Sequence, residues 1–393
     1  MHIAFIIPAF LPARDYGGPL YNTISLAQQY VKEGHGVTIY TTNAVTMKHF
    51  DRNIKITEEI LGIRVKRFPV VLKIGGYWVN PSIYQALKAD NFDIMHAQCL
   101  RCFQSDMAAA ISKKTNKPLV IGAHGSLGSI FSSRVSLKQK VMHSLHNPID
   151  VWDIRIARKL IAVNKFEKLV YQKYGVREDK IAEIPLGIDV SEFDDINGDF
   201  RGHFNIDNDE IMLLFVGRYN YVKGLDTLVK AFSEIIAKDN LSRKVRLVLI
   251  GKDDGYYGQL LDLISAHDTN DRIIALEGQP RDVILAAYKA CDICIVPSHF
   301  DTFPVTILEA LSCGKALIAS RVGGIPEVIE HGKTGILVEP GDVKSLSENM
   351  IELIVDEIKR KNLGVAGRAA VRKYDMATVA RQTMQLYSEL INS

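Results

Sequence analysis

The chain has 393 residues, of which 47% are hydrophobic and 24% charged, and its formal net charge is +3 at pH 7. A chain of this length is too long for a domain with a single hydrophobic core and fits two domains of the usual size. The small net charge argues against a dedicated nucleic-acid-binding protein, and no stretch reaches the ~20 apolar residues that span a bilayer.

The first half of the chain alternates short apolar runs with amphipathic segments. We predict strands at five of these runs: 2–8, 36–42, 92–97, 118–123 and 159–164. The segment LYNTISLAQQYVKEG, between the first two runs, has apolar residues at helical spacing and ends in a glycine, so it predicts a helix. This alternation indicates βα units built on a parallel sheet. The opening MHIAFIIPAF lacks the basic leader and the cleavage site of a signal peptide, so we expect a cytoplasmic protein.

Candidate ligand-binding residues follow two strands of this series. Gly17 and Gly18 open the predicted helix, whose first backbone N–H groups favour an anion or a closely approaching ligand. The GxGxxG pattern is absent, which argues against a nicotinamide-dependent dehydrogenase. His124 follows the strand at 118–123, at the edge of the sheet where ligands bind, whereas we expect His35 and His96 to be structural.

Two CxxC pairs invite a zinc interpretation that the pattern does not support. Cys291 and Cys294 lead into a predicted strand, where residues three apart point to opposite faces and cannot bind one metal ion. Cys99 and Cys102 follow a strand and enter a predicted helix. We therefore predict no metal site and expect reduced thiols, as in cytosolic proteins.

Positive charge is concentrated in residues 131–168, which contain eight Lys and Arg against three Asp and Glu. Apolar side chains such as Phe131 and Trp152 are interleaved with these charges. Two interpretations stay open. In one, the segment lies on an anionic membrane surface. In the other, it is a helical hairpin that packs its apolar side on the protein and leaves its charges in solvent.

The second half of the chain repeats the alternation. Residues 181–200 turn polar after a last strand and are predicted to be a linker. Further strands are predicted at 211–217, 245–251, 273–278, 292–298 and 315–321. The two series predict two doubly wound α/β domains, 1–190 and 191–372, followed by a C-terminal helix over 373–393.

The loop after the strand at 211–217 contains two cations, Arg218 and Lys223. Cations normally avoid the N-terminal end of a helix, so their position there indicates a bound phosphate. The alternative, that both are surface cations in solvent, stays open on this pattern alone. Asp207 and Asp209 imitate a DxD metal motif, but they precede the same strand. They therefore lie at the amino end of a parallel sheet, away from the edge where ligands bind.

The segment FDTFPVTILEALSCGKALIASRVGG, residues 300–324, places two carboxylates in apolar surroundings. Asp301 lies in a turn-like run and Glu309 on a predicted helix. Burying an unpaired carboxylate is costly, so either these groups face solvent or a polar partner sits against them.

The segments GRYNYVKGLDTLVKAF and PSHFDTFPVTILEALSCGKALIASRVGGIPEVIEHGKTGILVEPGD, with Gly17-Gly18 after the first strand, resemble glycosyltransferase family 4. The resemblance extends from residue 1 to the final helix and is densest over 211–342. It implies the GT-B fold, with two facing Rossmann-like domains. The N-terminal domain would bind the acceptor, the C-terminal domain would bind a nucleotide sugar, and the C-terminal helix would pack back on the N-terminal domain. It also implies a retaining transferase that uses a UDP- or GDP-sugar as donor substrate, without a cofactor or a metal.

The resemblance also assigns roles to individual residues. Glu309 stands at the second glutamate of the family's Glu-x7-Glu motif, which hydrogen-bonds the donor ribose. Asp301 stands at the first, which contacts the donor sugar, and its shorter side chain leaves the identity of that sugar open. Arg218 and Lys223 match the diphosphate clamp, and His124 matches a histidine that approaches the donor sugar. Further contacts to the nucleotide sugar are expected from Gly17, Gly18, Gly217, Gly251, Gln279, Phe303, Val305 and Thr306.

The function implied by this resemblance is sugar transfer to a hydroxyl of a glycan or lipid-linked glycan, in cell-envelope polysaccharide biosynthesis. The protein would then be cytoplasmic or peripheral on the cytoplasmic face of the membrane, with no nucleic-acid partner. Two alternatives stay open. A sugar-nucleotide epimerase of the same fold would convert the donor alone, and a non-catalytic nucleotide-sugar-binding protein would explain Asp301 in place of glutamate.

Overall fold

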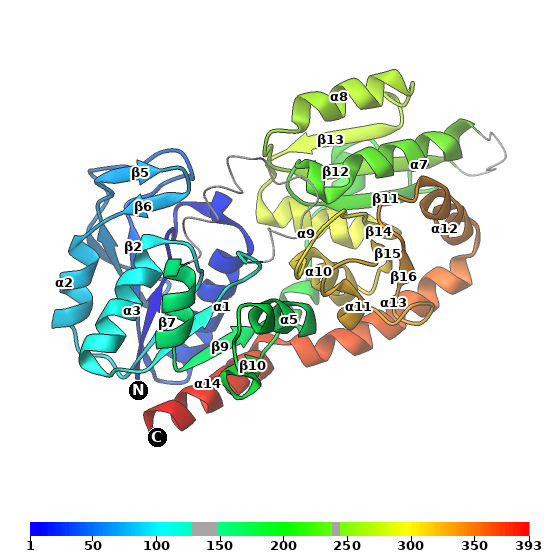
Figure 1. The fold of residues 1–393 in the computed structure, drawn as a ribbon. Helices are drawn as coiled ribbons and strands as arrows, with labels where there is room; N and C mark the ends of the chain where they lie inside the picture. The colour runs from blue at the N-terminus through cyan, green and yellow to red at the C-terminus, as the bar shows by residue number, and fades with distance from the viewer. Residues whose placement is uncertain (128–147, 238–243, 393) are drawn as a thin grey trace. The chain divides into compact units, whose positions relative to one another are not determined.

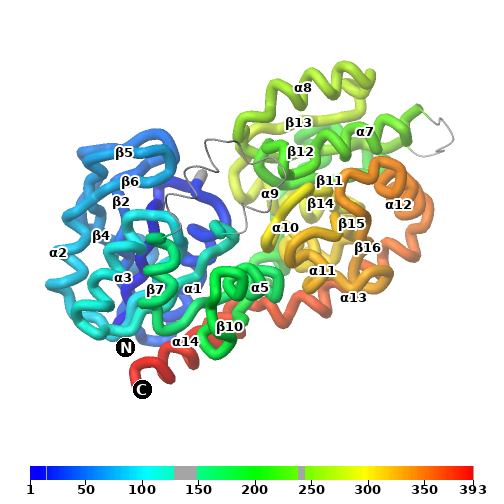
Figure 2. Tube along the Cα trace, viewed as in Figure 1, coloured from blue at the N-terminus to red at the C-terminus, as the bar shows by residue number. Residues whose placement is uncertain are grey.

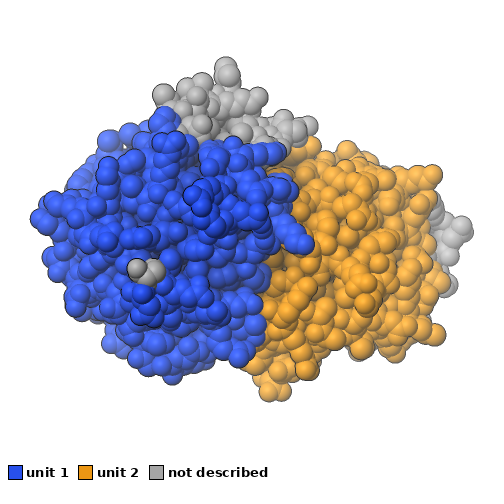
Figure 3. Space-filling model, turned by 60° about the horizontal axis from the view of Figure 1, so that its bottom comes forward, with its two compact units in different colours: residues 1–187, 376–393 blue, residues 188–375 orange. Residues whose placement is uncertain are grey.

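The computed structural model of the protein describes residues 1–127, 148–237 and 244–392 (Figure 1). The chain divides into two compact units, coloured separately in Figure 3. Unit 1 comprises Met1–Gly187 and Met376–Ser393, and unit 2 comprises Ile188–Asp375. Within the described part of the chain, no helix combines the length and the apolar character needed to cross a bilayer.

The main sheet of unit 1 has the strand order β10-β9-β8-β7-β1-β2-β4-β3, and its described pairings are parallel apart from β3 with β4. Its strands are β1 (His2–Ile6), β2 (Gly36–Thr42), β3 (Thr57–Ile60), β4 (Ile63–Phe68), β7 (Ile94–Ala97), β8 (Leu119–Gly122), β9 (Lys159–Ala162) and β10 (Ile181–Glu183). A separate hairpin is formed by β5 (Leu72–Ile74) and β6 (Tyr77–Val79). The strand order reverses at β1, between β2 and β7, and such a reversal is where doubly wound sheets bind ligands.

Helices cover both faces of this sheet because successive residues of a strand point to opposite sides. Ile3 and Phe5 of β1 belong to one hydrophobic core, whereas Ala4 and Ile6 belong to another. The helices of unit 1 are α1 (Gly18–Lys32), α2 (Ser82–Ala89), α3 (Phe103–Thr115), a helix over 148–156, α5 (Lys165–Lys173) and α14 (Met376–Ile391), with short 3-10 turns at η1 (Arg14–Tyr16) and η3 (Glu178–Lys180).

The C-terminal helix α14 packs against α1 in unit 1 (Figure 2). The Tyr30 hydroxyl on α1 donates a hydrogen bond to the Ala380 carbonyl at 3.3 Å, across 350 residues of sequence. The rings of Tyr30 and Tyr387 also meet edge to face, with centroids 6.1 Å apart. The last helix of the chain is therefore part of the first core.

Unit 2 is built on a sheet with the order β13-β12-β11-β14-β15-β16, and its described pairings are parallel. The strands are β11 (Ile211–Val216), β12 (Val245–Gly251), β13 (Ile273–Glu277), β14 (Ile293–Val296), β15 (Ala316–Ser320) and β16 (Ile336–Val338). The helices are α6 (Phe200–His203), α7 (Leu225–Ala237), α8 (Tyr257–Ala266), α9 (Arg281–Ala290), α10 (Val305–Ser312), α11 (Ile325–Val328), α12 (Val343–Val355) and α13 (Glu357–Val371), with 3-10 turns at η4 (Val190–Phe193), η5 (Tyr221–Lys223) and η6 (Arg372–Tyr374).

The strands predicted from apolar runs are all confirmed, and two of them, β2 and β12, have the predicted bounds. Several strands were not predicted: β3, β4, the hairpin β5–β6, and β16. β3 and β5 have no buried residue, so the apolar signal that marks a core strand is missing there. β16 is buried but has only three residues, which is too short for a pattern.

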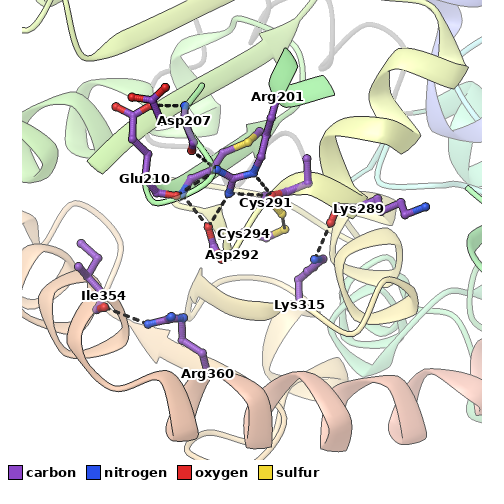
Figure 4. A network of polar contacts seen from close by, with 12 residues as sticks. Arg201, Asp207, Glu210, Lys289, Cys291, Asp292, Cys294, Lys315, Ile354 and Arg360 are labelled. Carbon is purple, nitrogen blue, oxygen red and sulfur yellow. Dashed lines mark hydrogen bonds and ion pairs between the residues drawn. The ribbon is translucent and has the colours of Figure 1, made fainter. Parts of the chain in front are cut away.

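Arg201, which directly follows the segment that was predicted to be a linker, makes polar contacts that order the chain ahead of β11 (Figure 4). Its guanidinium donates to the backbone carbonyls of Asp207, Glu210 and Ala290 and pairs with the Asp292 carboxylate at 2.9 Å. These contacts lie at the amino ends of β11 and β14. Asp207 therefore lies at the edge of the sheet opposite to its ligand-binding edge, as predicted.

The predicted geometry of Cys291 and Cys294 is wrong. Cys291 is the residue that caps the end of α9, ahead of β14, so strand alternation does not apply to it. The two Sγ atoms are 3.5 Å apart and both residues are buried (Figure 4). Burial, followed by the hydrogen bond with Cys291, raises the pKa of the Cys294 thiol well above its usual value. Among the described residues, no group of three His, Cys, Asp or Glu side chains is placed to hold a metal ion.

Candidate functional site

Unit 2 brings most of its predicted site residues to the carboxyl ends of its strands. The strand order reverses at β11, which lies between β12 and β14, so the loops after β11 and β14 lead away on either side of the reversal. The two loops are joined by the His299 N–H, which donates to the Val222 carbonyl at 2.8 Å. This edge of the sheet is therefore the natural place for a ligand in unit 2.

Lys223 and Asp301 form an ion pair across these two loops. The Lys223 Nζ and the Asp301 Oδ2 are 2.5 Å apart, and the side chains are only 19% and 12% exposed. Gly323, with φ +52°, allows the loop after β15 to close on Asp301, because a Cβ there would lie 1.8 Å from the Asp301 carbonyl oxygen. The Asp301 carboxylate thus has a polar partner, and this partner is Lys223, the lysine predicted to bind the diphosphate.

Arg218 follows β11 after Gly217 and is more accessible than Lys223. Its Nη1 lies 2.7 Å from the Asp254 Oδ2, and the two side chains are 58% and 41% exposed. Asp254 also accepts a hydrogen bond from the Asn220 amide at 2.9 Å. The guanidinium is thus held loosely at the solvent-facing side of the loop, and it keeps most of its donors available to an anion.

Gly251 has a packing reason for being glycine, and that reason is its close approach to Gly217. A Cβ on Gly251 would lie 1.8 Å from the Gly217 carbonyl oxygen, so the ends of β11 and β12 can approach only without a side chain there. Gln279 follows β13 and is half-buried, and its amide nitrogen donates to the Glu277 carbonyl at 3.1 Å. These three residues line up along the same edge of the sheet.

The N-terminus of α10 points its first backbone N–H groups toward the same edge. Helix α10 begins at Val305, after Pro304 in extended conformation. The first N–H groups of a helix have no acceptor within the helix, so those of Val305 and Thr306 are suited to an anionic oxygen. Phe303 is buried, with its ring centroid 5.9 Å from that of Tyr374, which fixes the approach of the chain to the helix.

Glu309, on the inner face of α10, is 7% exposed and is held by two side chains of α9. Arg281 pairs with one carboxylate oxygen, and the Tyr288 hydroxyl donates to the other at 2.8 Å. Arg281 also pairs with Glu192 of η4 at 2.8 Å. Arg281, Tyr288 and Glu192 were not predicted from the sequence as site residues. A signal for Arg281 existed, because it follows β13 at a strand-to-helix junction, as Arg218 follows β11.

In unit 1, Gly17 and Gly18 lie at the start of α1, after β1. Gly17 has φ +83°, a conformation that other residues rarely adopt, and it caps the helix without a side chain. A Cβ on either glycine would meet no atom within 4 Å. Packing therefore gives no reason for the absence of a side chain at Gly18, and the open space is compatible with a ligand at the helix N-terminus.

His124 lies after β8 in a left-handed conformation, with φ +47°. Its Nε2 is 2.7 Å from the Gln98 Oε1, which can only accept, so Nε2 carries the proton. The amide nitrogen of Gln98 donates to His96 at 3.1 Å, and the Tyr387 hydroxyl lies 2.5 Å from the same ring nitrogen. Burial lowers the pKa of His124 to about 4 and that of His96 to about 3, so both rings are neutral at pH 7.

The ring of His124 thus points into unit 1. Its second nitrogen, Nδ1, is buried and has no hydrogen-bond partner among the described residues. The network places His96 in the structural role that was predicted for it. In this conformation His124 offers no ring nitrogen to solvent, which the sequence pattern did not foresee.

Part of the basic segment lies outside the described residues, namely 131–147. In the remainder, some of the charges are engaged within unit 1. Asp150 is buried and pairs with Arg101 at 2.9 Å. Lys168 pairs with both Glu178 and Glu183, at 2.9 and 2.7 Å.

Two protein-family models match the chain. The model described as "Glycosyltransferase Family 4" matches residues 16–192, and the model described as "Glycosyl transferases group 1" matches residues 197–370. Together they span both units and include the loops described above.

Individual glycosyltransferases are also similar to this chain in sequence or in fold. An uncharacterised glycosyltransferase of Methanocaldococcus jannaschii is 25% identical over 96% of this chain and 95% of its own length. A D-inositol 3-phosphate glycosyltransferase of Corynebacterium efficiens is 28% identical over 58% of this chain and 56% of its own length. The solved structure of Anabaena Alr3699/HepE in complex with UDP and glucose covers 99% of this chain and 100% of its own, with a TM-score of 0.78 and 21% identity. The fold likeness identifies unit 1 and unit 2 as the two Rossmann-like domains of a GT-B architecture.

Proposed function

Because the chain belongs to the group 1 glycosyl transferases of family 4, we propose that it is a retaining, metal-independent enzyme that uses a UDP- or GDP-sugar as donor. The acceptor would be a hydroxyl of a glycan or a lipid-linked glycan, in the synthesis of a cell-envelope polysaccharide on the cytoplasmic side of the membrane. The structure of Anabaena Alr3699/HepE with UDP and glucose supports a uridine nucleotide among the candidate donors.

The observation that carries this proposal is the position of Arg218 and Lys223. Both lie in the loop that joins β11, at the reversal of the strand order, to the N-terminus of α7. A helix N-terminus attracts an anion, and two cations placed there add to that attraction. Arg218 supplies a planar fork of donors and Lys223 a point charge, which together suit the oxygens of a diphosphate.

The proposed reaction breaks the bond between the anomeric carbon and the diphosphate oxygen and forms a bond from that carbon to the acceptor oxygen on the same face. The acceptor proton passes to the departing phosphate oxygen, so no protein nucleophile is required. Arg218 and Lys223 stabilise the negative charge that grows on the diphosphate, and groups that act on charge developing in the transition state raise kcat. Asp301 pairs with the Lys223 ammonium and keeps it in place, and its carboxylate is proposed to contact the donor sugar.

A donor panel tests the proposal. The purified protein is incubated with UDP-, GDP- and ADP-sugars, with and without chelator, and release of nucleoside diphosphate is measured. Slow release from one donor that survives the chelator supports a metal-independent transferase and identifies its sugar. No release of nucleoside diphosphate from any donor, together with no nucleotide binding in calorimetry, would refute the proposal and support a non-catalytic role. Conversion of a donor to an epimer without release of nucleotide would instead identify an epimerase.

A further inference from the structure

Glu309 is a nearly buried carboxylate whose two oxygens are each engaged once. Arg281 donates to Oε1 through Nη1, and Tyr288 donates to Oε2 at 2.8 Å. Both donors come from α9, whereas Glu309 comes from α10, so the carboxylate is fixed by a neighbouring helix and not by its own. The Glu309 side chain keeps 10% of its surface exposed, so it is not completely sealed from solvent.

Counting acceptor positions shows what this arrangement leaves for a ligand. An ionised carboxylate has about four lone-pair sites, two on each oxygen. One site on each oxygen is taken by a protein donor, and one on each oxygen remains. Two acceptor sites on adjacent oxygens match two hydroxyl groups on adjacent carbons, which is the pattern of the ribose 2′- and 3′-hydroxyls. A carboxylate without these partners is free to turn about its last bond and presents no fixed pair of acceptors.

Arg281 is itself fixed before it reaches Glu309. Glu192 accepts from its Nε at 3.0 Å and from its Nη2 at 2.8 Å, and the guanidinium lies 5.5 Å from the centre of the Phe193 ring. Both partners belong to η4, so the guanidinium is clamped in plane and only Nη1 is directed at Glu309. A lysine cannot make this two-sided contact, because its ammonium has no planar fork.

Tyr288 complements this arrangement as a permanent donor. Burial, and then the neighbouring Glu309 charge, raise the pKa of Tyr288 well above its usual value. Its hydroxyl therefore keeps its proton at neutral pH, and that proton is directed at the Glu309 Oε2.

We propose that Arg281 and Tyr288 are positioning residues that orient Glu309 as the reader of the vicinal diol of the donor ribose. The inference rests on the proposed function, in which the protein binds a nucleotide-sugar donor, and on the ribose-binding role that the family resemblance gives to Glu309. The new element is that the selectivity for the diol depends on three side chains, Glu309, Arg281 and Tyr288. Glu192 holds Arg281 in place.

The experiment compares two ligands in several variants. Calorimetry measures the dissociation constants of UDP and of 2′,3′-dideoxy-UDP, and of the guanosine pair if the protein prefers GDP. Two hydrogen bonds to a charged acceptor predict that the wild type binds UDP ~10²-fold more tightly than the dideoxy analogue. In Arg281→Gln and Tyr288→Phe this ratio is expected to fall at least several-fold, chiefly through weaker binding of UDP. Arg281→Lys is expected to recover the ratio only in part.

Arg218→Ala is the matched control, since Arg218 lies at the same edge of the sheet but is proposed to bind the diphosphate. It should weaken both nucleotides equally and leave their ratio unchanged. If the wild-type ratio is large and Arg281→Gln and Tyr288→Phe retain it while binding both nucleotides less tightly, the two residues are merely structural and the inference is wrong. If the wild-type ratio is near one, Glu309 does not read the ribose and the inference is also wrong, whereas binding of neither nucleotide by the wild type would refute the proposed function itself. Thermal melting of each variant shows whether that variant is folded. If Arg281→Gln does not fold, Tyr288→Phe, which removes a single oxygen, still tests the inference.

Discussion

Replacing Lys223 with alanine is expected to lower both activity and stability, because Lys223 has two tasks. Its ammonium is proposed to stabilise the leaving diphosphate, and it also neutralises Asp301, which is 12% exposed. Removing one partner of a fully buried ion pair costs about 3–5 kcal/mol, since the other charge is left without compensation. Partial exposure of this pair reduces the expected loss to roughly 2–3 kcal/mol, by the screening that weakens surface pairs. For a unit of this size that loss lowers the melting temperature by roughly 5–10 °C.

Arg218→Ala separates the two tasks. The pair of Arg218 with Asp254 is about half exposed, and such pairs contribute ~1 kcal/mol or less. We therefore expect Arg218→Ala to melt within a few degrees of the wild type, although both variants should lose ~10²-fold or more in kcat, as other electrostatic catalytic groups do.

The assay combines calorimetric melting of each variant with nucleoside diphosphate release from the preferred donor. Equal melting temperatures for Lys223→Ala and Arg218→Ala would contradict the stabilising role of the Lys223–Asp301 pair. A retained kcat in Arg218→Ala would refute the assignment of this residue to the diphosphate. Asp301→Asn combined with Lys223→Ala should regain part of the lost stability, because the stranded charge is then removed as well.

Further predictions concern the packing, the pH dependence and the membrane. Gly251→Ala should destabilise unit 2 by a few kcal/mol, since its Cβ would lie 1.8 Å from a backbone oxygen, whereas Gly258→Ala, in open space within a helix, should be neutral or stabilising; urea denaturation checks both. Burial lowers the pKa of the His96 ring to about 3. The stabilisation of the folded state that results from this shift is complete above pH 6.5 and is lost as the pH falls. Between pH 7 and pH 5 the stability of His96→Gln should therefore fall by about 2 kcal/mol less than that of the wild type, and an equal fall in both would contradict this. If residues 131–168 contact membranes, the protein should float with anionic liposomes at low salt, and not with neutral ones; absence of binding would remove the membrane interpretation.

Sequence patterns located the candidate site of unit 2 because that site depends on order along the chain. In parallel sheets every strand delivers the residues after it to the same edge, so an apolar run followed by Arg218, or by Asp301, already places those residues together. The contact between Lys223 and Asp301, at 2.5 Å, is the consequence of this rule for β11 and β14, which are neighbours in the sheet. Neither the Lys223–Asp301 ion pair nor its burial could be inferred from the sequence. The two residues are 78 positions apart, and only the sheet shows that the strands before them are neighbours.

The sequence by itself determined the two doubly wound domains, the strands of their cores and the residues that follow them, because apolar periodicity and strand-to-helix punctuation are local signals. Tertiary structure alone decided which side chains meet and how they are oriented. Arg281 and Tyr288 hold Glu309 from another helix, Gln98 turns the ring of His124 inward, and the thiols of Cys291 and Cys294 meet at 3.5 Å. Each of these contacts joins elements whose distance and rotation are set by the packing of whole helices on a sheet, and no periodicity along the chain records that.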